Sequence, residues 1–220
     1  MNSENLYIVD VSSFIFRAFY AIRMLNAPDG TPVNAVYGVL TMLMKILQKP
    51  DCHHIVLAQD SKEKSFRSQI YEAYKANRQE PPEELRPQFK IIDDLLDVMG
   101  VARIKVPGQE ADDIIATISK KYKHQFKHIY IVSGDKDLFQ LVDDTTTMID
   151  TMKDIHYGVN EVKAKIGVYP HQVVDYLSLV GDSSDNVPGV KGIGEKGAIK
   201  LIEEFDSLEN ILKSNNIISN

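Results

Sequence analysis

Short apolar runs that lead to an aspartate recur along the chain. Each run is four or five residues long and consists largely of β-branched, leucine and tyrosine side chains, which predicts a buried strand. The runs and their acids are residues 6–9 with Asp10, residues 55–58 with Asp60, and residues 128–132 with Asp135 and Asp137. The same order of strand and carboxylate therefore occurs three times.

Segments with apolar residues at helical spacing separate these strands. The predicted helices are residues 12–22 (capped by Ser12 or Ser13), 34–47 (capped by Asn34), 84–99, 110–122, 138–142, 160–166, 170–180 and 195–204. Further strands are predicted at residues 102–105 and in an edge hairpin formed by 147–151 and 155–157. Strands that alternate with helices favour a mostly parallel sheet, so the predicted fold class is α/β.

The carboxyl ends of parallel strands lie on one edge of a sheet, where ligands bind, so the three strand-end acids are expected to converge. Glu110, Asp112 and Asp113 lie in the first turn of a predicted helix, where the helix dipole favours negative charge. An ordinary helix with an acidic first turn has the same pattern. However, a second acidic pair, Asp135 and Asp137, follows the next strand. Two acidic pairs on adjacent elements suggest a metal site.

A basic and aromatic segment, residues 62–78, follows the second strand. Its cations and aromatic side chains are Lys62, Lys64, Phe66, Arg67, Tyr71, Tyr74, Lys75 and Arg78. The next residues, 79–84, contain Pro81, Pro82 and three glutamates, which makes this the least compact part of the sequence. The segment is either a solvated surface loop or a mobile arch over the acidic site, with cations for phosphates and tyrosines for base stacking.

A glycine-rich segment, residues 189–198, follows a loop that contains Asp182 and Asp185, which are candidate ligands but also suit helix capping. It contains the spacing of a dinucleotide-binding fingerprint, but a loop with Pro188 precedes it instead of a strand. It also differs from a P-loop, because Glu195 stands where that motif has lysine. We therefore predict two short helices joined by residues 192–194.

The start of the second of these helices, residues 195–204, is suited to phosphate binding. Backbone N–H groups at a helix N-terminus bind phosphates, and Lys191, Lys196 and Lys200 add positive charge. Such contacts bind nucleic acid independently of its sequence.

Composition limits the classes of protein that fit. The chain has 220 residues, one cysteine (Cys52) and a formal charge of −6. No internal disulfide or cysteine-based zinc site is possible, and no stretch reaches the ~20 apolar residues that span a bilayer, so we predict a cytoplasmic protein without a membrane partner. Without the nine candidate metal-site acids the charge becomes +3. Net acidity therefore does not exclude a nucleic-acid partner.

Taken together, these motifs resemble the 5′ nuclease domain of bacterial DNA polymerase I, within the flap endonuclease family. The resemblance covers almost the whole chain. The motifs that carry it are Ile8-Val9-Asp10, Ser65-Phe66-Arg67, Tyr74-Lys75-x-x-Arg78, Glu110-Ala111-Asp112-Asp113, Asp135-Lys136-Asp137, and the run from Gly181-Asp182-x-x-Asp185-Asn186 to Gly194.

The resemblance implies a three-layer PIN-like α/β fold, a helical arch that passes a 5′ single strand, and a helix–hairpin–helix that holds duplex DNA. It implies a nuclease core at residues 1–180, with the arch at about 62–87, and a DNA-binding region at 181–220 packed on the core. The family domain usually continues beyond the position that corresponds to Asn220, so we expect either a fragment, with a polymerase region in the full chain, or a short stand-alone nuclease. A monomer is the default expectation.

The resemblance also assigns roles to residues. The implied metal-site acids are Asp10, Asp60, Glu110, Asp112, Asp135, Asp137, Asp182 and Asp185, with Asp113 at a more peripheral position. Lys75 and Arg78 are implied to contact the scissile phosphate and are, with Asp112 and Asp135, the predicted catalytic residues. The implied DNA-binding residues are Phe16, Arg17, Arg67, Tyr74, Lys75, Arg78, Lys191, Gly192, Gly194, Lys196 and Lys200. Main-chain carbonyls of Gly189, Val190 and Ile193 are implied to hold a monovalent cation such as K⁺.

A ligand set made only of carboxylates favours Mg²⁺ or Mn²⁺ over zinc. Two such ions ~4 Å apart activate water and stabilise the leaving oxygen in phosphodiester hydrolysis. Together with this chemistry, the resemblance implies the function of a 5′-3′ exonuclease and flap endonuclease in DNA replication and repair. The alternatives are a PIN-like ribonuclease, a catalytically silent DNA-binding relative, and an α/β domain whose acids have no catalytic role.

Overall fold

A computed structural model describes residues 4–214 of the chain. The last residues of the predicted DNA-binding region, 215–220, lie outside this range. The strands are β1 (Asn5–Asp10), β2 (His54–Ala58), β3 (Arg103–Ile104), β4 (His128–Val132), β5 (Thr146–Asp150), β6 (Ile155–Tyr157), β7 (Gly181–Asp182) and β8 (Val187–Pro188). The helices are α1 (Val11–Ala21), α2 (Asn34–Leu47), α3 (Arg67–Ile70), α4 (Arg86–Met99), α5 (Ala111–Tyr122), η1 (Lys136–Leu141), α6 (Val159–Ile166), η2 (Pro170–Gln172), α7 (Val173–Val180), α8 (Glu195–Phe205) and α9 (Leu208–Lys213).

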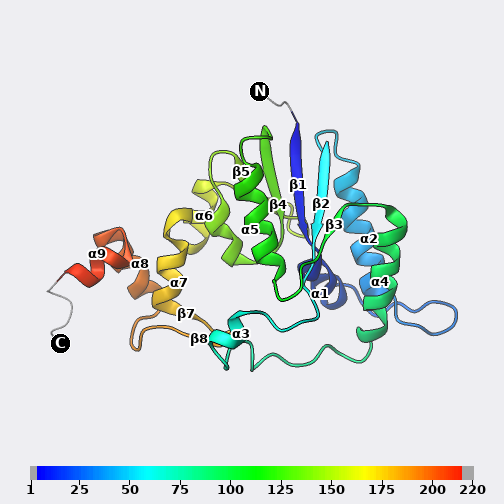
Figure 1. Cartoon of the computed structure of the whole chain (residues 1–220), viewed down its shortest axis with the longest axis horizontal. Coiled ribbons are helices and arrows are strands. Elements are labelled where there is room, and N and C mark those ends of the chain that lie inside the picture. The colour runs from blue at the N-terminus through cyan, green and yellow to red at the C-terminus, as the bar shows by residue number, and fades with distance from the viewer. Residues whose placement is uncertain (1–3, 215–220) are drawn as a thin grey trace.

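A mostly parallel sheet with the strand order β3-β2-β1-β4-β5-β6 forms the centre of the molecule (Figure 1). All neighbouring strands run parallel except β5 and β6, which form the predicted antiparallel hairpin at the edge. Because β1, β2 and β4 are neighbours, the acids that follow them reach the same edge of the sheet. The prediction of an α/β fold with a mostly parallel sheet is confirmed.

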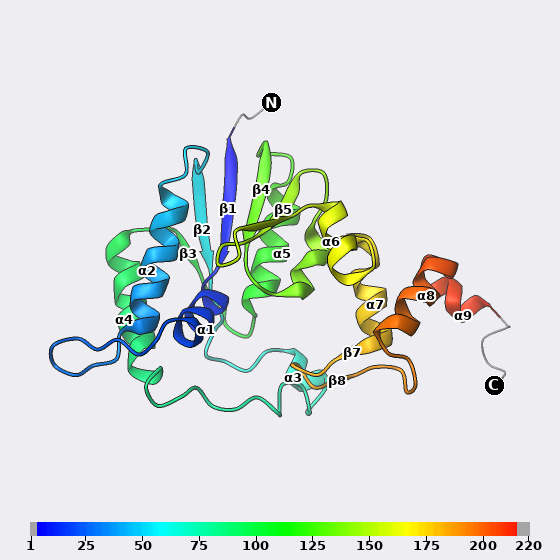
Figure 2. The ribbon, with the colours of Figure 1, turned by 180° about the vertical axis from the view of Figure 1, so that it is seen from behind.

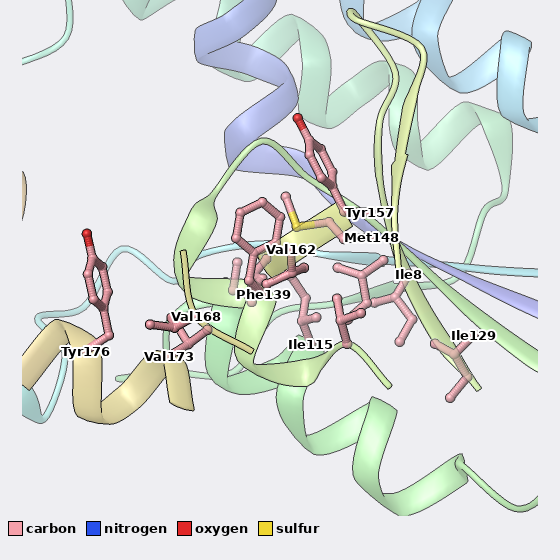
Figure 3. Close-up of a cluster of buried hydrophobic side chains, with 14 of the residues drawn as sticks. Ile8, Ile115, Ile129, Phe139, Met148, Tyr157, Val162, Val168, Val173 and Tyr176 are labelled. Carbon is pink, nitrogen blue, oxygen red and sulfur yellow. The ribbon is translucent and has the colours of Figure 1, made fainter. Parts of the chain in front are cut away.

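Helices cover both faces of this sheet, which gives three layers. One face packs against α5, η1 and the C-terminal helices, and Figure 3 shows Ile8, Ile115, Phe139 and Met148 of this cluster. The other face packs against α1, α2 and α4 through a cluster that includes Val9. Side chains of β1 alternate between the two clusters, and the whole strand is buried. Viewed from behind, α8 and α9 extend away from the sheet, beyond α7 (Figure 2).

Two predicted helix caps are wrong. Asp10, not Ser12 or Ser13, caps α1, because its carboxylate accepts the backbone N–H of Ser13 (2.9 Å). Asn34 is the first residue of α2 and does not cap it. Its amide instead donates to the carbonyls of Phe19 and Ile22, where α1 ends. In both cases a polar side chain is used by a contact that the local sequence does not specify.

The predicted helical arch, at about residues 62–87, contains less helix than expected in its part before α4, residues 62–85. Only α3 is α-helical there, and turns make up much of the remainder. None of residues 66–84 is buried, so little packing energy is available to stabilise a helix. The helix pair around residues 192–194 also differs from the prediction, because its first helix, α7, ends at Val180 and the two-stranded ladder β7–β8 lies between.

Candidate active site

Carboxylates from several elements line one cavity of about 1020 Å³ beside the carboxyl ends of β1, β2 and β4. Asp10 ends β1, Asp60 follows β2, Asp112 lies in the first turn of α5, and Asp135 and Asp137 follow β4. Asp182 at the end of β7 and Asp185 in the turn before β8 add two more aspartates, and the remaining acids of the lining are Asp150, which ends β5, and Glu195, which begins α8. Strand order therefore brings together acids that are far apart in the sequence, as the repeated pattern of strand and aspartate predicts.

Local donors orient several of these carboxylates. Asp10 accepts the hydroxyl of Ser133 (2.7 Å), and Asp135 accepts the backbone N–H of Asp137 (3.0 Å). Asp60 accepts the hydroxyl of Ser12 and the backbone N–H of Ala111. The acids are thus held in fixed orientations around the cavity.

Burial and mutual repulsion raise the pKa values of the central acids. Burial, together with the charges of Asp10, Asp135 and Asp60, raises the pKa of Asp112 to about 8. Burial and neighbouring aspartates also raise the pKa of Asp137 to about 7. Burial raises the pKa of Asp10 to about 6, despite its hydrogen bonds. The cavity therefore holds more negative charge than the surrounding protein compensates.

The arch brings cations onto one side of this acidic cavity. The ammonium of Lys75 lies 2.9 Å from Glu110 and 3.6 Å from Asp185, and the guanidinium of Arg78 lies 2.5 Å from Asp185. The Tyr74 hydroxyl lies 2.9 Å from both Glu110 and Asp185. Lys75 and Arg78 also line the cavity, so the predicted catalytic cations meet the predicted metal-site acids.

Glu110 and Asp113 are placed differently from the other acids, because neither contributes to the cavity lining. Arg67 binds Asp113 through both guanidinium nitrogens (2.8 and 2.7 Å) and lies 3.7 Å from Glu110. The hydrogen bond from Arg67 lowers the pKa of Asp113. The carboxylate of Asp113 is therefore already neutralised by an arginine predicted to bind DNA.

Phe16 and Arg17 of α1 both line the cavity. Arg17 pairs with the buried Asp150 (2.6 Å). Asp150 ends β5, so it repeats the pattern of a strand followed by an aspartate. This pattern is visible in the sequence, but Asp150 was not predicted as a site residue. Sequence analysis also missed three lysines of the lining, Lys136, Lys153 and Lys165. No sequence pattern distinguishes these lysines from ordinary surface residues.

None of residues 189–194 in the glycine-rich loop lines the cavity, although Glu195, which follows them, does. Lys191, Lys196 and Lys200 are exposed, as are Gly192 and Gly194. The predicted ligands for a monovalent cation, Gly189, Val190 and Ile193, also belong to this loop. In this loop the carbonyl of Val190 accepts the backbone N–H of Ile193 (3.0 Å).

Within residues 4–214, no group of three or more histidine, cysteine, aspartate or glutamate side chains is arranged closely enough to hold a metal ion. The same part of the chain has no helix with the length and apolarity needed to cross a membrane. The predicted aspartates other than Asp113 thus line one cavity, but their carboxylates are not placed at the mutual distances of a bound metal site.

A parallel sheet that collects carboxylates at one edge, beneath a segment that supplies cations, defines a class of α/β domains suited to phosphodiester hydrolysis. Residues 5–167 match the family described as "5'-3' exonuclease, N-terminal resolvase-like domain", and residues 168–220 match "5'-3' exonuclease, C-terminal SAM fold". The chain belongs to the 5′-3′ exonuclease family and is a nuclease, so the resemblance seen in the sequence is confirmed.

Two relatives illustrate the family. The chain is 40% identical over 211 residues to a 5′-3′ exonuclease of Aquifex aeolicus, and the match covers 96% of this chain and 73% of that protein. It is 42% identical over 215 residues to DNA polymerase I of Bacillus subtilis, where the match covers 96% of this chain and 24% of the polymerase. The chain therefore spans about a quarter of the polymerase.

Solved structures share the fold. The T5 D15 protein, co-crystallised with metal ions, superposes with a TM-score of 0.83 at 23% identity, covering 99% of this chain and 81% of that chain. The catalytic core of Rad2 in complex with DNA substrate superposes with a TM-score of 0.61 at 19% identity, covering 95% and 64%. These similarities confirm the predicted PIN-like three-layer fold.

Proposed function

We propose that this nuclease hydrolyses DNA at 5′ ends and at 5′ flaps next to a duplex, with Mg²⁺ or Mn²⁺ ions bound by the acids of the cavity. The observation that carries the proposal is the convergence of eight aspartates on one cavity that Lys75 and Arg78 also line. Asp150 already pairs with Arg17, which leaves seven aspartates as candidate ligands. A structure of the T5 D15 flap endonuclease in complex with DNA and metal ions, 24% identical to this chain, is consistent with this substrate.

The donor set fits hard divalent cations. The cavity offers carboxylate oxygens, and the raised pKa values of Asp112 and Asp137 indicate negative charge that a cation would neutralise. We propose Asp10, Asp60, Asp112, Asp135, Asp137, Asp182 and Asp185 as the ligands. When bound, such ions supply an activated water and stabilise charge on the leaving oxygen.

Residues of the chain itself account for the other steps. Lys75 and Arg78 lie on a segment without buried side chains, so their charged groups can turn from the acids to a phosphodiester and stabilise its negative charge. Lys191, Lys196 and Lys200 are exposed near the start of α8 and suit the backbone of a duplex. Glu110, although outside the lining, is expected to take part by releasing Lys75.

Some finer assignments remain predictions. They are the division of the chain at residues 180 and 181, the K⁺ site at Gly189, Val190 and Ile193, the metal roles of Glu110 and Asp113, the DNA contacts of Phe16, Arg17, Arg67 and Tyr74, the monomeric and cytoplasmic state, and attachment to a polymerase region.

The substrate is tested by comparing three labelled nucleic acids under single-turnover conditions with Mg²⁺: a 5′-flap DNA, a fully paired DNA with closed ends, and a single-stranded RNA. We expect cleavage of the flap DNA near its junction and little cleavage of the other two. Faster cleavage of the RNA would instead favour a ribonuclease. DNA binding without cleavage of any substrate would favour a catalytically silent relative.

Metal binding is expected to stabilise the fold. A ligand at about 100 times its Kd adds about 2.7 kcal/mol, which corresponds to a Tm increase of roughly 8 °C for a domain of this size. We expect this increase with Mg²⁺ or Mn²⁺ in differential scanning fluorimetry, and a much smaller increase for Asp112→Asn. In EDTA, Asp112→Asn should be at least as stable as the unsubstituted protein, because it removes a buried carboxyl whose charged form is disfavoured by burial and by neighbouring aspartates. Equal metal-induced increases in both proteins would contradict the ligand assignment.

A further inference from the structure

The arch is fastened to the β7–β8 turn by two asparagine side chains. The amide of Asn186 donates to the carbonyl of Ala73 (2.7 Å), and the amide of Asn77 donates to the carbonyl of Ser183 (2.7 Å). One bond therefore runs from the turn to the arch and the other from the arch to the turn. We refer to these two hydrogen bonds as the clasp.

A backbone hydrogen bond lies between the two bonds of the clasp. The N–H of Lys75 donates to the carbonyl of Asp185 (2.9 Å). Lys75 has φ 56° and Asn186 has φ 58°, which is the left-handed region that costs a non-glycine residue about 1–2 kcal/mol. Both residues hold this conformation where arch and turn meet, so the contacts between the two segments must offset its cost.

The clasp brackets the backbone that carries the catalytic cations. Ala73 and Asn77 lie on either side of Lys75, and Arg78 follows Asn77 directly. Hydrophobic packing does not hold this stretch, because none of residues 66–84 is buried. Apart from the charged and tyrosine contacts of the site itself and the backbone bond of Lys75, the clasp is thus the means by which residues 73–78 keep their place over the acids.

Neither asparagine is part of the charged network. Asn77 is exposed, and the amides of Asn77 and Asn186 bond main-chain carbonyls and not carboxylates. Their substitution therefore leaves every charge of the cavity in place. This separates the placement of the cations from their chemistry.

We propose that Asn77 and Asn186 are positioning residues, which hold the arch against the β7–β8 turn and so place Lys75 and Arg78 over the acidic cavity. The inference rests on the proposed function, because it assigns these cations to the phosphodiester. Without the clasp the arch opens, and the cations reach the site only part of the time. A misplacement of ~1 Å can cost about 10²-fold in rate, so the effect on the chemical step should be measurable.

Limited trypsin digestion tests the clasp without substrate or metal. Trypsin cuts after Lys75 and Arg78, and the exposed Lys64, outside the clasp, provides an internal reference in the same arch. We expect the double variant Asn77→Ala/Asn186→Gly to be cut after Lys75 and Arg78 at least about fivefold faster, with unchanged cutting after Lys64. Glycine is chosen for residue 186 because it keeps the left-handed backbone while removing the amide.

The same variants are then assayed for turnover of the 5′-flap DNA. The single-turnover rate at saturating DNA should fall about 10-fold or more in the double variant, while the Kd for DNA changes less than about threefold. Asn77→Gln, which retains an amide, should lose less of the rate than Asn77→Ala. The matched controls are Asp154→Gly, another left-handed residue in a turn, and Asn210→Ala, whose exposed amide also donates to a main-chain carbonyl; neither should change trypsin cutting or turnover.

The possible results distinguish the clasp from the proposed function. Unchanged cutting after Lys75 and Arg78 overturns the clasp, as does lost turnover without faster cutting. If the double variant has a lowered Tm, Asn77→Ala alone decides, because its side chain is exposed. A wild-type protein that does not cut flap DNA overturns the proposed function, and the trypsin result still decides whether the clasp holds the arch.

Discussion

Replacing Asp135 by asparagine is expected to lower the rate of flap cleavage by about 10²- to 10³-fold and to leave DNA affinity nearly unchanged. Loss of a single electrostatic group at a catalytic centre has effects of this size. Asparagine is close to aspartate in shape and can still accept the backbone N–H of Asp137, so the local turn should survive. The rate is measured in single-turnover assays with Mg²⁺, and affinity by fluorescence anisotropy in Ca²⁺.

Asp29→Asn is the matched control for this substitution. Asp29 also accepts a backbone N–H two residues later, that of Thr31 (2.9 Å), but it is exposed in a loop and does not line the cavity. We expect its rate to equal that of the unsubstituted protein. Cleavage by Asp135→Asn at the control rate would remove Asp135 from the catalytic centre, and a parallel loss of DNA binding would indicate that its role is in binding.

Replacing Gly189 by alanine is expected to destabilise the protein by about 3 kcal/mol and to lower its Tm by roughly 10 °C. A Cβ atom at this position would lie 2.3 Å from the carbonyl carbon and oxygen of Val180 and 2.7 Å from the nitrogen of Gly181. These are main-chain atoms, so no side-chain rotation relieves the overlap, and β8 must move away from the end of α7. Thermal unfolding followed by circular dichroism measures the loss.

Gly194→Ala is the control for the stability measurement. A Cβ atom there meets no atom within 4 Å, and the backbone is extended (φ −98°). Its Tm should change by less than about 2 °C, in line with substitutions away from packed atoms. Equal Tm values for both alanine variants would show that the approach of β8 to α7 is not tight in solution. Because β7 and β8 carry the turn of Asp182 and Asp185, we also expect slower flap cleavage by Gly189→Ala.

The sheet and its acidic edge were predictable from the sequence. Each strand is a short apolar run, and the strands alternate with helices along the chain. Both signals depend only on residues that are close in sequence. The positions of Asp10, Asp60 and Asp135 then follow from the rule that parallel strands end on the same edge. Asp150 obeys the same rule and was open to prediction, although its pairing with Arg17 was not.

Other parts of the site were not predictable, because they depend on contacts between distant segments. The motif that contains Asp112 also contains Asp113, yet only Asp112 lines the cavity, since Arg67 of the arch binds Asp113. Likewise, Asn34 suits a helix cap, but the end of α1 lies close enough to use its amide instead. Equivalent residues in the sequence thus differ in role once their neighbours are known.

The sequence alone determined the fold class, the family and the set of acids that meet at the sheet edge, because hydrophobic periodicity and strand-end carboxylates are local features. Only the tertiary structure decided which cation lies on which acid and what holds the arch in place. Asn77 and Asn186 bond to carbonyls 106 and 113 residues away, respectively, and main-chain carbonyls carry no mark in a sequence. Such contacts form only after the chain has folded back on itself, so no local pattern reveals them.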